Sequence, residues 1–249
     1  MGTYIRLVDY KSSEEKECHF QTDINRYVSD SKKFSEIPGS PYAYWVSDSV
    51  RKDFSEDSFG AHFEIRAGIC TGENETFIKN WYEMDYSLSS LCTEKYRYVP
   101  HNKGGEYRKW YGNRDYFLKY NEQDLKKMET KKGYRHDGKE CYFKNHVGWS
   151  KITSSRYSFR LFDTNFTFDS AGLGLFSKDG KMDDLLWALG FLNSKIATYF
   201  INLLNPTLNV TPMVVKNLPM INSEEAKDID AIVDENISMA NSISLQPNS

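Results

Sequence analysis

The feature that most constrains the fold is a change of pattern at Lys181. After this residue, "MDDLLWALGFLNSKIATYFINLL" places seven apolar residues at helical spacing: Met182, Leu185, Leu186, Leu189, Leu192, Ile196 and Phe200. Before it, short aromatic-rich runs alternate with Gly, Pro, Asn and Asp, as in strands joined by turns. The chain is 15% aromatic, and aromatic residues favour strands. The sequence therefore predicts strands first and helices in the last third.

The strand-like runs include "AHFEIRAGIC", "FIKNWYEM", "GWSKITSSRYSFRLF" and "FTFDSAGLGLF". Residues 96–120 alternate around two glycine turns and predict hairpins or a long structured loop. A short polar helix is predicted in "QDLKKMETKKGYRHDGKE", broken at Gly133. Residues 1–37 form a lead-in segment, and residues 222–249 a C-terminal helix, capped by Asn222 or Ser223, with a frayed tail.

Several classes of protein are disfavoured. No run of 18 apolar residues predicts a membrane span, and no signal peptide is evident at the N-terminus. The four cysteines form no CxxC pair, so we expect reduced thiols rather than a disulfide framework or a metal site. Cys141 has His136 and His146 five residues to either side, but a zinc site needs a fuller set of ligands. No pattern of catalytic, cofactor-binding or metal-ligating residues stands out.

"FTFDSAGLGLF" is the closest imitation of a cofactor loop, with Asp169 followed by Gly172 and Gly174. Such loops need a helix that begins at once, because the N-terminus of the helix faces the cofactor. Here the next helix is predicted only at about Met182. We therefore interpret this segment as a strand interrupted by small residues.

Charge is distributed unevenly along the chain. The net charge is only −3, yet residues 95–160 carry 17 Lys and Arg against 7 Asp and Glu. A basic surplus of this size in one third of a mildly acidic chain is the distribution expected of a surface that binds a polyanion.

The basic third contains "PHNKGGEYRKWYGNRDYF", where cations and aromatics surround a Gly-Gly pair. Arginine can bind guanine edges, lysine can hold phosphates, and aromatics can stack on bases. The Gly pair permits a tight turn or a close approach to a phosphate. The alternative is a solvated hairpin whose aromatics pack inward. The charge surplus favours nucleic acid.

Six segments in order resemble a known family: "IPGSPYAYWVSD", "GICTGENETFIKNWYEM", "VPHNKGGEYRKWYGNRDYFLKY", "VGWSKITSSRYSFRLF", "FTFDSAGLGLF" and "LGFLNSKIATYFINLLNPTLNVTPMVVKNLPMI". They are similar to the C-terminal target-recognition region of PglX, the adenine-specific DNA methyltransferase family of BREX phage defence. They also resemble related type IIG restriction–modification enzymes. The resemblance runs from about Tyr4 to Ile221. The family's cofactor loop and Asn-Pro-Pro-Tyr motif do not occur here.

The resemblance implies an α+β target-recognition domain over residues 38–221, with a mixed, mostly antiparallel sheet and C-terminal helices. It implies a specificity module without catalysis of its own, acting in the bacterial cytoplasm. S-adenosylmethionine is implied only for the absent methyltransferase domain. The implied partners are double-stranded DNA, a methyltransferase domain or subunit, and other proteins of the defence complex. Alternatives left open are a protein-docking module and a remnant endonuclease.

The candidate DNA-binding residues lie in the segments that match "NKGG-RKWYGN" and "WSKISSS". They are Asn102, Lys103, Gly104, Gly105, Arg108, Lys109, Trp110, Tyr111, Asn113, Arg114, Lys151, Ser154, Ser155 and Arg156. Among them, Arg and Lys are expected on phosphates or guanine, and Asn and Ser on base edges. Trp110 and Tyr111 suit packing as well as stacking. The proline-rich return at residues 205–219 is expected beside the DNA or at the sheet edge.

Overall fold

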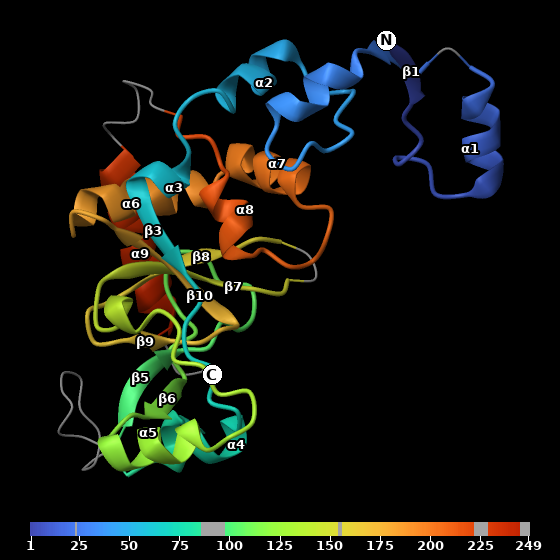
Figure 1. Cartoon of the computed structure of the whole chain (residues 1–249). Helices are drawn as coiled ribbons and strands as arrows, with labels where there is room; N and C mark the ends of the chain where they lie inside the picture. Colours follow the sequence, from blue (N-terminus) through green and yellow to red (C-terminus); the bar gives the residue numbers. More distant parts are fainter. Residues whose placement is uncertain (23, 86–97, 154–155, 222–228, 245–249) are drawn as a thin grey trace.

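The computed structural model describes residues 1–22, 24–85, 98–153, 156–221 and 229–244, and two four-stranded sheets organise this part of the chain (Figure 1). The first sheet has the order β3-β10-β7-β8, and all its neighbouring strands are antiparallel. The second has the order β4-β6-β5-β9, with only β5 and β9 parallel. The predicted α+β fold with mostly antiparallel strands and C-terminal helices is confirmed.

The first sheet carries the larger core. Its strands are β3 (Phe63–Arg66), β7 (His146–Ser150), β8 (Phe159–Phe162) and β10 (Gly172–Ser177). Val147, Trp149, Leu173 and Leu175 point into this core, and the residues between them are buried as well, so both faces of β7 and β10 are covered. The helices that complete this core are α3 (Phe59–His62), α6 (Met182–Leu192), α7 (Lys195–Leu204), α8 (Pro212–Lys216) and α9 (Ile229–Ser244).

The second sheet builds a smaller core at the other end of the body in Figure 1. Its strands are β4 (Ile78–Asn80), β5 (Tyr98–Asn102), β6 (Tyr116–Lys119) and β9 (Thr167–Phe168). Around it lie α4 (Asn74–Phe77), α5 (Glu122–Glu129) and the 3-10 turns η2 (Trp81–Glu83) and η4 (Lys139–Cys141). β5 and β6 form the predicted hairpin, and residues 103–115 are its long structured loop.

The lead-in segment extends from the body in Figure 1. It contains β1 (Gly2–Ile5), α1 (Ser13–Phe20), β2 (Arg26–Ser29) and η1 (Ser31–Glu36), followed by α2 (Asp48–Asp53). A capping box of Ser12 and Glu15 begins α1. The ring of Tyr44 stacks on Tyr4 at 4.9 Å between centroids, which ties the small β1–β2 sheet to the following turn.

The long helical run predicted from Met182 is divided into α6 and α7 at Asn193. The Asn193 side chain donates to the Phe159 carbonyl at 2.9 Å and accepts from the Phe159 N–H at 3.0 Å, so it fastens the end of α6 to strand β8. Ser194 then caps α7 by accepting from the Ala197 N–H. The predicted caps of the last helix, Asn222 and Ser223, lie outside the described residues. None of the helices within the described ranges is both long and apolar enough for a bilayer crossing.

A buried histidine makes the stability of this fold depend on pH. His146 stacks on Phe162, and its Nδ1–H donates to the Lys144 carbonyl at 3.0 Å. Burial lowers the pKa of His146 to about 4, against 6.5 when exposed. The imidazole of His146 therefore binds a proton more tightly in the unfolded chain than in the folded one. The stabilisation that neutral His146 gives the folded state is complete above pH 6.5 and is lost as pH falls towards 4.

We expect His146 to account for about 2 kcal/mol of the stability lost between pH 7 and pH 5. Urea unfolding at both pH values would measure this, with His146→Phe as the comparison. The variant should lose correspondingly less stability over the same interval. An equal loss in the two proteins would contradict the assignment.

Candidate nucleic-acid interface

The loop between β5 and β6 folds back onto the first sheet. Trp110 donates its N–H to the Phe159 carbonyl at 2.9 Å, and its own carbonyl accepts from the Leu161 N–H at 3.0 Å. These two bonds add Trp110 to the edge of β8, with a positive φ of 73°. The Trp110 side chain packs against the first core. The basic loop is therefore an ordered extension of the sheet edge.

The second candidate segment continues β7 beyond its end. The Lys151 N–H donates to the Ala171 carbonyl at 2.8 Å, and the Lys151 carbonyl accepts from the Val210 N–H at 2.8 Å. Thr153 donates its N–H to the Leu208 carbonyl at 3.1 Å. The proline-rich return thus lies along the continuation of β7.

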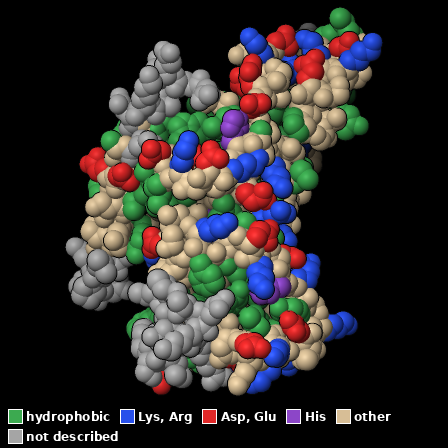
Figure 2. Space-filling view, turned by 60° about the vertical axis from the view of Figure 1, so that its left-hand side comes forward, with side chains coloured by type: hydrophobic (Ala, Val, Ile, Leu, Met, Phe, Trp, Pro, Cys, Tyr) green, Lys and Arg blue, Asp and Glu red, His purple; other side chains and the backbone are tan. Residues whose placement is uncertain are grey.

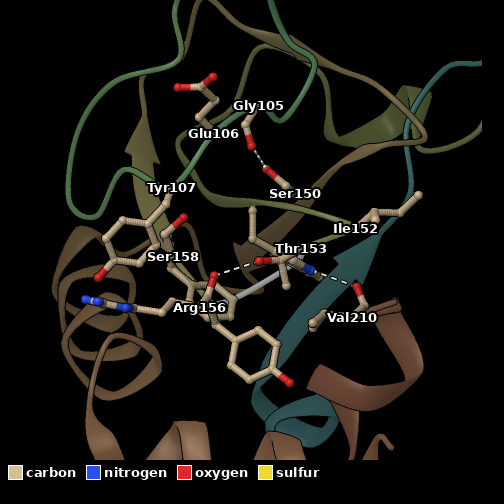
Figure 3. A pocket seen from close by; sticks show the side chains of 12 residues that line it. Gly105, Glu106, Tyr107, Ser150, Ile152, Thr153, Arg156, Ser158 and Val210 are labelled. Atoms are coloured by element: carbon tan, nitrogen blue, oxygen red, sulfur yellow. Dashed lines mark hydrogen bonds between the residues drawn. The ribbon is translucent and has the colours of Figure 1, made fainter. Parts of the chain in front are cut away.

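The two segments meet at a cavity of about 240 Å³ (Figure 3). The Ser150 hydroxyl joins them directly, donating to the Gly105 carbonyl at 2.7 Å. Trp149 also lines the cavity, and its indole N–H donates to the carbonyl of Val210, another lining residue, at 2.9 Å. The remaining lining residues are Glu106, Tyr107, Ile152, Thr153, Arg156, Tyr157, Ser158 and Phe159. Segments that sequence reasoning singled out separately therefore form one concave polar surface.

Arg160 joins the two segments through the hydrogen bonds of its buried side chain. It is not among the residues predicted from the sequence. Its side chain is 0% exposed. Its guanidinium donates to the carbonyl of Arg108 at 3.1 Å, the carbonyl of Glu106 at 3.4 Å and the hydroxyl of Ser150 at 3.0 Å. Burial, with the nearby charge of Arg108, lowers the pKa of Arg160 to about 10, so it stays charged at neutral pH. The only signal in the sequence is an arginine inside the apolar strand "SFRLF".

The predicted cations divide into two groups. Arg108 and Arg156 are exposed, and Lys103 and Lys151 are half-buried. The other two are engaged within the chain. Lys109 Nζ donates to the Asn193 carbonyl at 2.6 Å, where α6 ends. Arg114 bonds the Asp163 carboxylate at 2.6 Å and lies 4.1 Å from the Tyr111 ring, so it supports the loop together with Tyr111.

The predicted base-reading amides point inward. Asn102 is fully buried, and its Oδ1 accepts from the Gly104 N–H at 3.0 Å. Asn113 is buried too, and its Nδ2 donates to the Glu106 carbonyl at 2.9 Å. These contacts shape the loop and leave neither amide on the surface described. Ser154 and Ser155 lie outside the described residues.

The Gly104–Gly105 pair is explained by close packing and by positive φ angles of 79° and 125°. A Cβ on Gly104 would lie 3.0 Å from the Ala171 carbonyl oxygen, and one on Gly105 would lie 2.9 Å from Asn113 Nδ2. The pair therefore makes the turn that brings the loop against β10, as glycines at such φ values do.

The basic surplus of residues 95–160 does not gather at the cavity. Part of it lies on and after α5 beside the second sheet, where Lys126 pairs with Glu122 and Lys131 with Glu73, both at 2.6 Å. On the face that Figure 2 presents, Lys and Arg side chains are interspersed with Asp and Glu. The cavity is consequently bordered by far fewer cations than the 17 Lys and Arg of residues 95–160.

The Asp169–Gly174 segment forms a turn and strand, as interpreted from the sequence. A Cβ on Gly172 would lie 2.4 Å from the Asn102 carbonyl oxygen, so the space beside this glycine is filled by the protein's own backbone. Over the ranges that the structure describes, no three His, Cys, Asp or Glu side chains are grouped so as to hold a metal ion.

Fold and site together define an α+β domain with an ordered, partly basic loop over a polar cavity. No protein-family profile matches the chain. It is similar to the adenine-specific methyltransferase PglX of Lacticaseibacillus casei (strain Zhang), 34% identical over 241 residues, covering 88% of this chain and 20% of that protein. It is also 28% identical over 228 residues to the adenine-specific methyltransferase BrxX of Escherichia coli O9:H4 (strain HS), covering 91% of this chain and 19% of that protein. The chain is thus homologous to adenine-specific methyltransferases, and spans about a fifth of the length of these curated relatives.

Proposed function

We propose that this chain is a DNA sequence-recognition module of an N6-adenine DNA methyltransferase that serves a BREX or restriction–modification phage-defence system. The homology to adenine-specific methyltransferases supports this proposal, because it covers nearly all of this chain but a small part of the relatives. The arrangement at the cavity supports it further. Two segments that carry exposed cations meet at one concave polar surface, a geometry suited to an anionic ligand such as a DNA backbone.

In this account the chain binds double-stranded DNA in the bacterial cytoplasm and performs no catalysis alone. A methyltransferase domain or subunit would bind S-adenosylmethionine and transfer its methyl group to adenine. Other proteins of the defence complex are further candidate partners. Lys103, Arg108, Lys151 and Arg156 are the cations that we expect on DNA. Asn102 and Asn113 act by holding the loop, and Lys109, Arg114, Trp110 and Tyr111 support it.

Arg108 and Lys109 are adjacent but should differ when each is changed to alanine. Arg108 is exposed, so Arg108→Ala should weaken DNA binding about tenfold with little change in stability. Lys109→Ala should lower the free energy of unfolding by about 1 kcal/mol, because Lys109 Nζ bonds a carbonyl at the C-terminal end of α6. Fluorescence anisotropy and urea unfolding of each variant separate the two effects. Equal destabilisation by both variants would contradict these roles.

The sequence-recognition role is tested by selection from a random duplex library. The purified chain should enrich a common motif over successive rounds, and that motif should be lost in the Arg108→Ala, Arg156→Ala double variant. Tight binding without any enriched motif would contradict a specificity role.

A further inference from the structure

Arg160 is a buried cation with no buried anion to balance it. Within the described residues, no carboxylate forms an ion pair with Arg160, and its four contacts are two carbonyls and the hydroxyls of Ser150 and Ser158. Its Nε has no partner. Buried charges in proteins are normally paired, because an isolated charge is unfavourable in a low-dielectric interior. The environment of Arg160 is therefore suited to an anion from outside the chain.

The cavity beside Arg160 offers unused hydrogen-bond donors. Ser158 Oγ accepts from the Arg108 N–H at 3.4 Å and from Arg160 Nη1 at 3.5 Å, which leaves its own O–H to donate. Over the ranges described, that O–H has no acceptor. The backbone N–H groups of Glu106 and Tyr107, two residues that line the same cavity, have none either. Donors without acceptors, next to a buried cation, favour an oxyanion as the ligand.

The cavity lining holds one cation and one carboxylate, Arg156 and Glu106. The guanidinium of Arg156 lies 5.6 Å from the centroid of the Tyr107 ring, and both residues line the cavity. Glu106 is the acidic lining residue, and Figure 3 shows its side chain turned away from Ser158 and Thr153. The cavity volume of about 240 Å³ is below that of pockets for drug-sized ligands, which begin at roughly 300 Å³, and suits one small group.

We propose that this cavity is a phosphate-binding site, with Ser158 and the N–H groups of Glu106 and Tyr107 as donors. Arg160 does not line the cavity and would act from behind Ser150 and Ser158 as the buried charge. The identification of the ligand as one phosphodiester of a DNA backbone rests on the proposed function. The anion site itself follows from the donors and the buried arginine. In this arrangement a single phosphate would fix the register of the module on the duplex.

Inorganic phosphate is the probe for the site alone. Titration with phosphate, against chloride at matched ionic strength, should shift the backbone amide resonances of Glu106 and Tyr107 in a saturable manner. Ser158→Ala should weaken this binding about tenfold. Ser55→Ala is the matched control, because Ser55 is exposed, lies outside the cavity and donates only to the Lys52 carbonyl. Shifts that do not saturate, or an affinity unchanged by Ser158→Ala, would overturn the proposal.

Duplexes with one neutral methylphosphonate at successive positions test the source of the phosphate. One position should weaken binding to the unmodified protein about tenfold, and should have little further effect on Ser158→Ala, because the two changes remove the same contact. If duplex binds but phosphate does not occupy the cavity, this inference fails and the proposed function stands. If phosphate binds there but duplex does not bind at all, the phosphate site stands and the proposed function fails.

Discussion

Replacing Arg160 with alanine is expected to lower the free energy of unfolding by about 3 kcal/mol. The substitution leaves the carbonyl of Arg108 and the hydroxyl of Ser150 without their buried donor, and it opens a cavity where a fully buried side chain was. The Glu106 carbonyl loses one of its two donors and keeps Asn113 Nδ2. Relief of a buried charge offsets part of this loss. The loop at residues 103–115 would lose a support that joins it to both β7 and β8.

The matched control is Arg156→Ala. Arg156 lies at the same cavity, but its side chain is exposed, so its loss should change stability by less than about 0.5 kcal/mol. Urea unfolding at pH 7 measures both variants. The account of Arg160 as the support of the loop would be wrong if the two variants had equal stability.

Gly172→Ala is also expected to lower the free energy of unfolding by about 3 kcal/mol, for a different reason. A Cβ at this position would lie 2.4 Å from the Asn102 carbonyl oxygen and 2.5 Å from the Gly104 nitrogen. Both atoms belong to the backbone where β5 ends and the loop at residues 103–115 begins, so they cannot move without shifting that loop. Weaker DNA binding should therefore accompany the loss of stability.

Gly60→Ala is the control for this second prediction. Gly60 lies in α3, and a Cβ there would meet Lys216 at 3.3 Å, a distance that a small shift relieves. We expect Gly60→Ala to change the free energy of unfolding by no more than about 1 kcal/mol and to leave DNA binding unaltered. Thermal unfolding and anisotropy of the two glycine variants make the comparison. A tolerated Gly172→Ala would show that the loop is not packed against β10 as described.

The local elements of this fold could be predicted because their signals are local. Helical spacing from Met182 to Phe200, the glycine turns of residues 96–120 and the alternation in "AHFEIRAGIC" all depend on neighbours in sequence. The break at Asn193 could not be predicted, because it depends on hydrogen bonds to Phe159 in a distant strand. The parallel pairing of β5 with β9 is non-local in the same way.

The site was predictable as two segments but not residue by residue. Composition shows that Asn102, Asn113, Lys109 and Arg114 are polar, but not that the fold turns them toward its own backbone and side chains. The charge tally likewise could not show that several lysines belong to α5 and its neighbourhood. Arg160 escaped notice because an isolated arginine in a strand has no pattern to mark it.

The central claim, that this chain binds duplex DNA, is tested most directly by fluorescence anisotropy with labelled random-sequence duplex over a range of salt concentrations. The account predicts binding whose logarithmic affinity falls linearly with the logarithm of the salt concentration, with a slope of about 0.9 per phosphate engaged. Arg108→Ala should make that slope shallower by about one. An absence of binding even at low salt, or binding that is indifferent to salt, would contradict the claim and favour a module that docks on protein.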